Sequence, residues 1–375
     1  MVPEEVVNFG AGPAKLPPEV LLEVQQELLN YGDTGIGVME MSHRSSTYDK
    51  IHNDTINLFK EILDVPDNYK ILFVHGGGRG AFAAVALNLI QKTGEADYLI
   101  TGTWSNIAAQ DAEIFGKVNR VIPPLAKGQN APDLSDLKLS ENASYFYYCA
   151  NETIEGFELP VVPPITNVPI VCDMSSNILT KKIDVSKYGV VLFCVQKNIG
   201  PAGVAVLIVR EDLIGSKKPN CPVFLDFSVV SKSNSLLNTP PTFVIYVCGK
   251  VLKHVKKVGG IQAMEKLCRI KSEILYNLID DSDGFFINEV HPTCRSRINV
   301  TFRIKGGKEV EDKFLELAQK AGMIQLKGHR SVSGIRASLY NAITVEEVAK
   351  LAGLMRLFEG EYSFHNKLQN GDADK

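Results

Sequence analysis

The sequence lacks the marks of a secreted, membrane or nucleic-acid-binding protein. None of its seven cysteines forms a Cys-x-x-Cys pair and the number is odd, so neither a disulfide framework nor a metal site is expected. Unbroken apolar runs reach about seven residues, far short of the ~20 that a membrane-spanning helix needs. Lysine and arginine number 40 against 43 aspartates and glutamates, without the basic excess of a nucleic-acid binder. The first residues carry no apolar leader. We expect a soluble, cytoplasmic protein.

The residues that are present predict an α/β fold. Of the 375 residues, 45% are hydrophobic, enough to build a large core. Short apolar runs alternate with helical patterns, as in a parallel sheet buried on both faces. These predicted strands cover residues 70–74, 98–101, 145–149, 170–172, 190–195 and 204–209.

The pattern changes near residue 240, where long helices begin. An alternating strand follows at 298–304, which is typical of an antiparallel sheet. Thr344 and Glu347 predict a capping box at the start of the last helix. We therefore expect a large domain with a mostly parallel, helix-covered central sheet and a smaller α+β C-terminal domain. The predicted bounds are an N-terminal segment at 1–15 that packs near the small domain, a large domain at 16–265 and a small domain at 266–375, with a polar tail from about 361.

A run of glycines, Gly76-Gly77-Gly78-Arg79-Gly80, follows the first apolar strand and precedes a helix predicted over 81–90. Backbone N–H groups in such a turn, together with a helix N-terminus, favour a phosphate. The spacing Gly76-x-Gly78-x-x-Ala81 also fits a loose dinucleotide fingerprint, with Asp97 further on. A purely structural turn is the alternative.

Two charged residues stand at the ends of apolar strands. Lys197 follows the run 190–195, and Asp173 follows 170–172. Desolvation would lower the pKa of Lys197, as an amine nucleophile needs, although a lysine at a strand end can also extend into solvent. Asp173 would point into the crevice where α/β proteins bind ligands, or cap a helix.

The lysine, the aspartate and the glycine turn together suit pyridoxal phosphate. The lysine would hold the aldehyde, the carboxylate would keep the pyridine nitrogen protonated, and the glycines would hold the phosphate. Trp104, the only tryptophan, could stack on the ring or pack in the core.

Cationic residues occur in two further motifs. His43 and Arg44 lie in the first, and the second contains His329, Arg330 and Arg336. Arginine binds carboxylates and phosphates in a bidentate manner, so these residues could serve a substrate that carries both groups, or lie on solvated surface.

Taken together and in order, the motifs make the chain resemble the phosphoserine aminotransferase family, pyridoxal-phosphate enzymes of fold type I within the class V aminotransferases. The resemblance runs from residue 8 to the helix after Asn341. It rests on residues 8–17, 41–46, 76–80, 148–153, 173–177, 196–203, 238–241 and 328–341.

The resemblance implies a role for each matching residue. Lys197 would bind the cofactor covalently, Asp173 would face the ring nitrogen, Trp104 would stack on the ring and Thr153 would bond its phenolic oxygen. The phosphate would be held by Gly78, Arg79 and Gln196, and by Asn238 and Thr239 of the neighbouring subunit in a homodimer. The substrate α-carboxylate would bind Arg336. The phosphate of phosphoserine or the side-chain carboxylate of glutamate would bind His43, Arg44, His329 and Arg330.

The implied reaction is O-phospho-L-serine + 2-oxoglutarate ⇌ 3-phosphooxypyruvate + L-glutamate, in serine biosynthesis. Two positions depart from the family pattern. Leu237 stands where the family usually has tyrosine, and Asp226-Phe227-Ser228 stands where an acidic residue, a tyrosine and a basic residue are usual. Both departures lie in the segment that would form the dimer interface. The alternatives are a class V aminotransferase acting on serine or alanine with glyoxylate, a dinucleotide-dependent oxidoreductase that uses the Gly76 turn, and a scaffold without catalytic activity.

Overall fold

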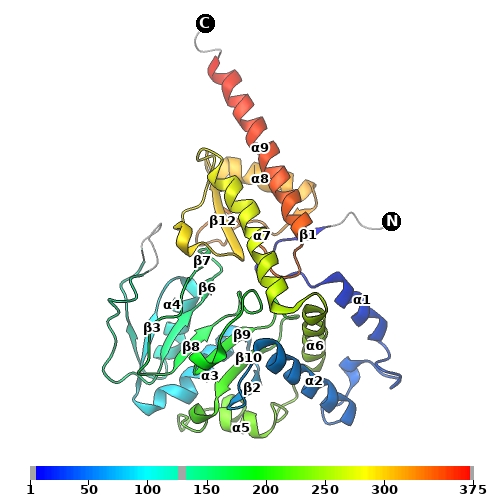
Figure 1. Cartoon of the computed structure of the whole chain (residues 1–375), viewed down its shortest axis with the longest axis vertical. Coiled ribbons are helices and arrows are strands. Elements are labelled where there is room, and N and C mark those ends of the chain that lie inside the picture. Colours follow the sequence, from blue (N-terminus) through cyan, green and yellow to red (C-terminus); the bar gives the residue numbers. More distant parts are fainter. Residues whose placement is uncertain (1–5, 126–131, 372–375) are drawn as a thin grey trace.

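The computed structural model describes residues 6–125 and 132–371, so the predictions for residues 1–5 and 372–375 lie outside the described part. A seven-stranded sheet forms the centre of the larger body, with helices on both faces (Figure 1). Its strand order is β2 (Tyr69–Val74), β10 (Ala205–Arg210), β9 (Val190–Cys194), β8 (Ile170–Asp173), β5 (Phe146–Cys149), β3 (Glu95–Leu99) and β4 (Lys117–Arg120).

One strand of this sheet runs against the others. β10 is antiparallel to both β9 and β2, whereas the remaining pairs are parallel. Only residues 195–204 separate β9 from β10, and this stretch contains no helix. A parallel return needs a longer crossover, so the short connection accounts for the reversal. The prediction of a mostly parallel, helix-covered sheet is confirmed.

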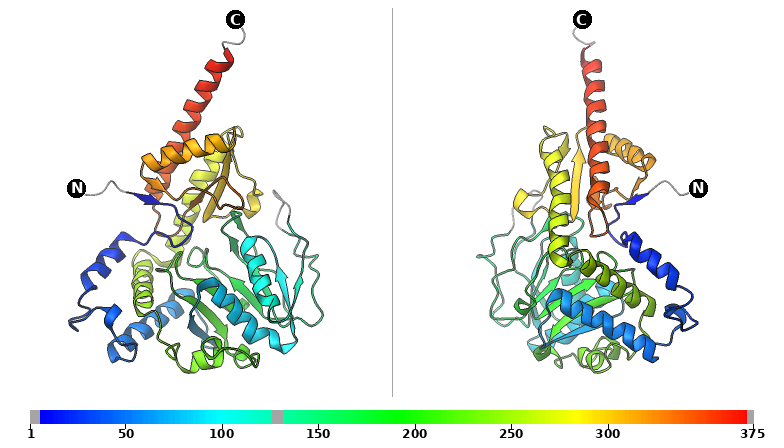
Figure 2. Two further views of the ribbon diagram at one scale, coloured as in Figure 1. Left: turned by 180° about the vertical axis from the view of Figure 1, so that it is seen from behind. Right: turned by 45° about the vertical axis from the view of Figure 1, so that its right-hand side comes forward.

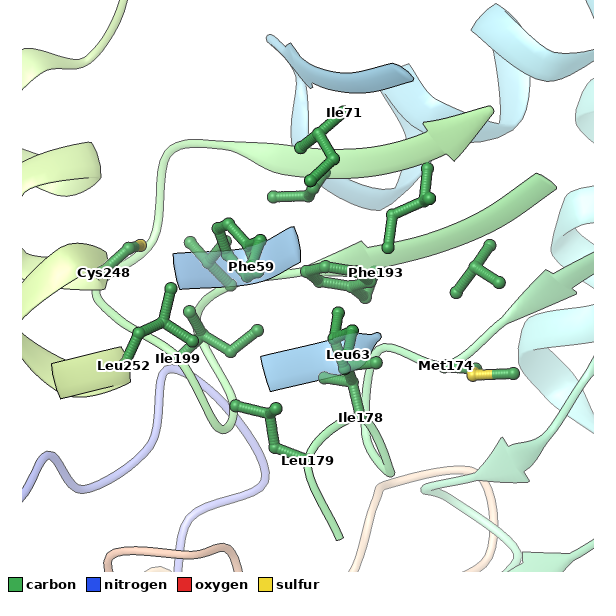
Figure 3. Close-up of a cluster of buried hydrophobic side chains, with 14 of the residues drawn as sticks. Phe59, Leu63, Ile71, Met174, Ile178, Leu179, Phe193, Ile199, Cys248 and Leu252 are labelled. Carbon is green, nitrogen blue, oxygen red and sulfur yellow. The ribbon is translucent and has the colours of Figure 1, made fainter. Parts of the chain in front are cut away.

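The helices divide between the two faces. One core packs the sheet against α2 (Ser46–Leu63) and α6 (Thr242–Lys257), and Figure 3 shows Phe59 of α2 beside Phe193 of β9 within it. A second core covers the opposite face. Its helices are α3 (Gly77–Leu89), α4 (Thr103–Glu113) and α5 (Phe227–Lys232).

Helix α3 begins earlier than predicted. The sequence analysis placed its start at residue 81, but the helix starts at Gly77, with Gly76 as its N-cap at φ 87°. The left-handed φ of Gly76 strongly favours glycine there. The predicted loop is therefore the cap and first turn of the helix, which directs the N–H groups of residues 77–79 out of its N-terminal end.

A smaller body carries its own core, separate from those of the large sheet. Three antiparallel strands form its sheet, in the order β11 (Phe286–Ile287), β12 (Asn299–Ile304) and β14 (Ile335–Ser338). Its helices are α7 (Gly260–Asp280), α8 (Lys308–Lys320) and α9 (Val345–Gly371), and Figure 2 shows α9 projecting away from the large sheet. The predicted boundary at 265/266 falls inside α7, and the three-part division stays a prediction.

The sequence predicts the start of helix α9 correctly but not its end. The capping box is confirmed, because Thr344 N–H donates to Glu347 and the N–H of Glu347 donates to the Thr344 hydroxyl. Helix α9 continues to Gly371, so the region predicted as a polar tail is helical along its backbone to that point. No proline interrupts residues 361–371, which allows the helix to run on.

The remaining short elements complete the chain. β1 (Val7–Asn8) pairs in parallel with β13 (Met323–Ile324), so the N-terminal strand lies against the smaller body. The others are helix α1 (Pro18–Glu27), the hairpin β6 (Asn151–Glu152) and β7 (Phe157–Glu158), and the 3₁₀ turns η1 (Val38–Glu40), η2 (Ile90–Lys92), η3 (Val185–Lys187), η4 (Glu211–Leu213), η5 (Val223–Leu225) and η6 (Pro292–Cys294). Among the described residues no helix has both the length and the apolar character needed to cross a bilayer.

Candidate active site

The strand topology gathers most of the predicted cofactor residues at one edge of the large sheet. Strands β2, β3, β5, β8 and β9 run in one direction, so their carboxyl ends share an edge. Ligands of open α/β sheets bind outside such ends. The glycine turn follows β2, Trp104 follows β3, Thr153 lies after β5, Asp173 ends β8 and Lys197 follows β9.

Lys197 lies in the middle of this edge. Its Nζ is 5.9 Å from the centroid of the Trp104 ring. The N-terminal segment covers it from the other side, because a Cβ added at Gly12 would lie 3.2 Å from Lys197 Cγ. Ala14 N–H donates to the carbonyl of Gln196 at 2.9 Å, which fixes that segment beside the lysine. Within the described part of the chain, the ammonium makes no hydrogen bond or ion pair.

The expected lowering of the Lys197 pKa is wrong for the cofactor-free chain. Burial does act in that direction, since it disfavours the ammonium. The negative charges that Tyr340 and Asp173 can carry, followed by those of nearby thiols, outweigh burial and raise the pKa above the ordinary lysine value.

Asp173 is buried at the end of β8 with one oxygen engaged. Its Oδ1 accepts the N–H of Ser175 at 2.8 Å. The Ser175 hydroxyl is a further hydrogen-bond partner of this carboxylate. Burial raises the Asp173 pKa, and the Ser175 contacts and Lys197 offset this only in part. A protonated ring nitrogen would supply a further cation opposite this carboxylate.

Trp104 and Thr153 are joined directly. The indole Nε1–H donates to Thr153 Oγ1 at 2.8 Å. Because that oxygen is an acceptor here, the threonine keeps its own hydroxyl proton for another partner. Arg336 on β14 donates from Nη1 to the carbonyl of Thr153 at 3.2 Å. The smaller body thus contributes a cation next to the cofactor residues.

The glycine turn offers an anion cradle. The first-turn N–H groups of Gly77, Gly78 and Arg79 have no acceptor among the described residues, whereas Gly80 N–H already donates to Gly76. A Cβ at Gly78 would lie 3.4 Å from the Cys194 sulfur at the end of β9. Free amides at a helix N-terminus, together with an ammonium, a buried carboxylate and an indole, fit pyridoxal phosphate.

Other predicted residues lie apart from this cluster. The Arg79 side chain is largely exposed and faces Asp111 at 3.5 Å. Asn238 and Thr239 are exposed, and Asn238 Nδ2 lies 3.5 Å from Nε2 of His75 in its own chain. The exposed Arg44 precedes α2, and Arg330 is exposed between β13 and β14.

The two His-Arg pairs are not joined in one chain. No hydrogen bond or ion pair within the described ranges links either His43 or Arg44 to His329, Arg330 or Arg336. His43 Nε2 is buried and has no hydrogen-bond partner in the described part of the chain, and His329 Nδ1 contacts the Ser331 hydroxyl at 2.7 Å. The predicted convergence of these residues therefore stays a prediction. No set of three or more His, Cys, Asp or Glu side chains in the described ranges could hold a metal ion.

Several residues around the site were not singled out from the sequence. Tyr340 donates from its hydroxyl to Ala11 at 2.8 Å and acts on the pKa of Lys197 and Arg336. Ser175 accepts the N–H of Cys194 at 3.0 Å and so ties the loop after Asp173 to the end of β9. Each lies inside one of the motifs that carried the resemblance, which was the signal available.

Comparison with known proteins matches this geometry. The family model described as aminotransferase class-V matches residues 6–351. A phosphoserine aminotransferase of Drosophila melanogaster is 57% identical over 94% of this chain and 98% of its own length. One from Hahella chejuensis is 46% identical over 94% and 98%. A solved, pyridoxal-phosphate-bound phosphoserine aminotransferase from Trichomonas vaginalis superposes with a TM-score of 0.90 at 37% identity, covering 94% of this chain and all of that one.

Proposed function

The chain belongs to the class-V aminotransferase family, and from this premise we propose that it exchanges an amino group between O-phospho-L-serine and 2-oxoglutarate with pyridoxal phosphate as cofactor. The products are 3-phosphooxypyruvate and L-glutamate, and the reaction belongs to serine biosynthesis. One observation carries the proposal, namely that Lys197, Asp173, Trp104 and Thr153 meet at one edge of the sheet. Family membership removes the dinucleotide-dependent oxidoreductase from consideration.

Each side chain at this edge has a defined task toward the cofactor. Lys197 binds it covalently, Asp173 holds a negative charge opposite the ring nitrogen, and Thr153 donates its free proton to the phenolic oxygen. Trp104 orients the ring by stacking. The amides of Gly77, Gly78 and Arg79 bind the phosphate, with Gln196 beside them. When bound, pyridoxal phosphate supplies an electron sink that lets a proton leave the substrate Cα.

Proton movement is assigned to Lys197. With its amine free, Lys197 Nζ would take the proton from the substrate Cα and later return one, as a general base and then a general acid. Burial raises the Asp173 pKa in the cofactor-free chain, and a protonated ring nitrogen opposite it would favour the ionised carboxylate. The smaller body closes the site from above the sheet, where Arg336 binds the substrate α-carboxylate in a bidentate manner.

Binding of the substrate phosphate requires more cations than a single chain places beside Arg336. We assign this task to His43, Arg44, His329 and Arg330, and we infer that the first two are supplied by a second copy of the chain. The same copy would bring Asn238 and Thr239 to the neighbouring cofactor phosphate. In support, no contact within one chain's described residues unites the two His-Arg pairs.

Exposed apolar side chains shortly before His43 and Arg44 in sequence support a homodimer. Five of them lie between residues 21 and 39, with Leu29 79% and Leu22 58% exposed. Exposed apolar side chains that gather on a surface mark interaction sites. The other three are Leu21, Ile36 and Met39. Leu237, one of the two departures from the family pattern, is also exposed next to Asn238.

The location follows from the cysteine chemistry. All seven cysteines are free and buried, which suits a reducing compartment. We therefore propose that the protein acts in the cytoplasm.

A transamination assay tests the proposed substrate. Purified holoenzyme is given glutamate with 3-phosphooxypyruvate, and in parallel glutamate with hydroxypyruvate, which lacks the phosphate. The phosphorylated acceptor is expected to react with a kcat/KM at least about a hundredfold higher, because unpaired cations would be left facing the smaller one. Equal values would contradict the proposal, and so would preferential use of glyoxylate with serine or alanine.

A further inference from the structure

Two glutamates, Glu152 and Glu155, hold the first turn of helix α4, from which Trp104 projects. Glu152 is fully buried at the end of β6. Its Oε2 accepts the backbone N–H of Trp104 at 2.8 Å, and its Oε1 accepts the backbone N–H of Ser105 at 2.9 Å. Glu155 Oε1 accepts the N–H of Thr103 at 2.9 Å and the Thr103 hydroxyl at 2.5 Å. Three N–H groups that a helix start leaves unpaired are thus all bonded to carboxylates.

The two carboxylates are engaged unequally. Both oxygens of Glu152 accept a backbone N–H, whereas Glu155 Oε2 is buried without a hydrogen-bond partner among the described residues. Gly102 lies between them, since a Cβ there would be 2.7 Å from Glu152 Cδ and 2.7 Å from Glu155 Oε2. Glycine at this position is what lets both acids reach the helix end.

One stretch of chain therefore fixes Trp104 twice. Glu152 bonds its backbone, and the next residue, Thr153, accepts its indole N–H. The ring can neither slide along the helix axis nor rotate without breaking one of these bonds. The same indole bond determines where the Thr153 hydroxyl proton can point.

The ionisable groups around the two glutamates influence the pKa of Glu152. Burial and then the charge of Glu155 raise the Glu152 pKa, while its bonds to Ser105 and Trp104 act in the opposite direction. Tyr147 and Cys149 also face Glu152, and Arg336 is the cation that acts on Glu155. Two acids this close repel each other when both are ionised, so neutralising Glu155 should relieve Glu152.

We propose that Glu152 is a positioning residue which, through both of its carboxylate oxygens, sets the orientation of Trp104 and of the Thr153 hydroxyl for the cofactor, and that Glu155 is a dispensable companion. This rests on the proposed function, because it takes the Trp104 ring to be the surface on which pyridoxal phosphate stacks. The proposal predicts an asymmetry between two chemically identical substitutions three residues apart.

The two substitutions are Glu152→Gln and Glu155→Gln. In Glu152→Gln an amide NH₂ must face a backbone N–H, and two donors cannot pair. In Glu155→Gln the side-chain oxygen can keep the Thr103 bonds, and the NH₂ takes the place of the unpartnered Oε2. The first change should disturb Trp104 and the second should leave it in place.

The test uses the only tryptophan as its probe. Fluorescence emission and near-ultraviolet circular dichroism of the cofactor-free protein report Trp104 without any catalysis, and titration with pyridoxal phosphate gives the affinity. Glu152→Gln should shift the emission, weaken the aromatic dichroism and weaken cofactor binding by about tenfold or more. Glu155→Gln should match the wild type in all three.

Wild-type spectra and affinity in Glu152→Gln would overturn the proposal, and so would equal losses in both variants. If Glu152→Gln does not fold, amide hydrogen exchange of the wild type decides. The N–H groups of Trp104 and Ser105 should exchange far more slowly than the free first-turn amides of Gly77 and Gly78, and equal rates would overturn the proposal. Failure of the wild type to bind pyridoxal phosphate would instead refute the proposed function.

Discussion

The indole N–H of Trp104 donates a 2.8 Å hydrogen bond to the hydroxyl of Thr153, although 48 other residues separate the two in sequence. Lys197 Nζ lies 5.9 Å from the same indole ring. Trp104 follows strand β3, Thr153 follows β5 and Lys197 follows β9, so the three residues come from three different strand ends. The bond leaves the threonine hydroxyl proton available and turns one face of the indole toward the lysine, so it prepares both residues for a flat aromatic ligand.

Replacement of Thr153 by valine should weaken cofactor binding. Valine keeps the shape but leaves the partly buried indole N–H of Trp104 without an acceptor and removes the donor to the ligand. We expect the dissociation constant of pyridoxal phosphate to rise by about tenfold. Thr153→Ser keeps the hydroxyl and should bind like the wild type. Equal binding by the valine variant, measured by fluorescence titration, would contradict the role of this hydroxyl.

Replacement of Asp173 by asparagine should lower the activity and change how the stability of the protein depends on pH. Asparagine cannot hold a negative charge opposite the ring nitrogen, so kcat should fall by about a hundredfold or more. Burial raises the folded-state pKa of Asp173 above 3.8, so the folded cofactor-free chain binds this proton more tightly than the unfolded chain. Its stability therefore falls as pH rises from about 4 through the folded pKa.

The Asp173→Asn variant has no ionisable side chain at this position, so this pH dependence is absent from it. In the cofactor-free state it should gain thermal stability relative to the wild type as pH is raised from 4 to 8. Melting temperatures measured across that range check the sign. A growing advantage of the wild type at higher pH would show that Asp173 is already paired with a cation when no cofactor is bound.

Replacement of Arg336 by lysine should impair the substrate and spare the cofactor. Lysine carries the charge but cannot form the bidentate contact of a guanidinium with a carboxylate. The KM for glutamate and for phosphoserine should each rise about tenfold or more, while pyridoxal phosphate affinity stays unchanged. Arg303→Lys on the neighbouring strand, where the arginine pairs with Glu311, is the matched control. If both variants behave alike, Arg336 does not contact the substrate.

Mixed dimers test whether two chains share each site. Lys197→Ala and Arg44→Ala should each be nearly inactive alone. Subunit exchange between the two variants produces a hybrid dimer. If Arg44 serves the neighbouring site, one of the two hybrid sites contains both an intact Lys197 and an intact Arg44. Activity should then return to a substantial fraction of the wild-type value. If Arg44 serves its own chain, each hybrid site lacks one residue and no activity returns.

The sequence allowed the fold and the core of the site to be predicted because both depend on strand ends. Lys197 and Asp173 follow recognisable apolar runs, and parallel strands place such ends at one edge. The reversal of β10 was not foreseen, since periodicity reports burial but not direction. The early start of α3 was missed because the glycine-rich residues 76–80 are typical of a loop, although Gly77–Gly80 form the first turn of the helix.

Contacts between distant side chains could not be predicted from spacing. The pairing of Glu152 with the start of α4 joins residues 47 and 48 positions apart, and no local pattern encodes it. The raised pKa of Lys197 also escaped prediction, because it depends on Tyr340 and Asp173, which reach it only in the folded chain. The proposed contribution of Arg44 to the site of a second copy is determined neither by the sequence pattern nor by a single chain.

The central claim is that Lys197 carries the cofactor. The most direct measurement is to load the protein with pyridoxal phosphate, reduce it with borohydride to make the attachment permanent, and locate the modified lysine by peptide mass spectrometry. The account predicts modification at Lys197, and none at the active site of Lys197→Ala or at Lys271, which is buried among the carbonyls of Leu339, Tyr340 and Ile343. Stoichiometric modification of a different lysine, or of none, would contradict it.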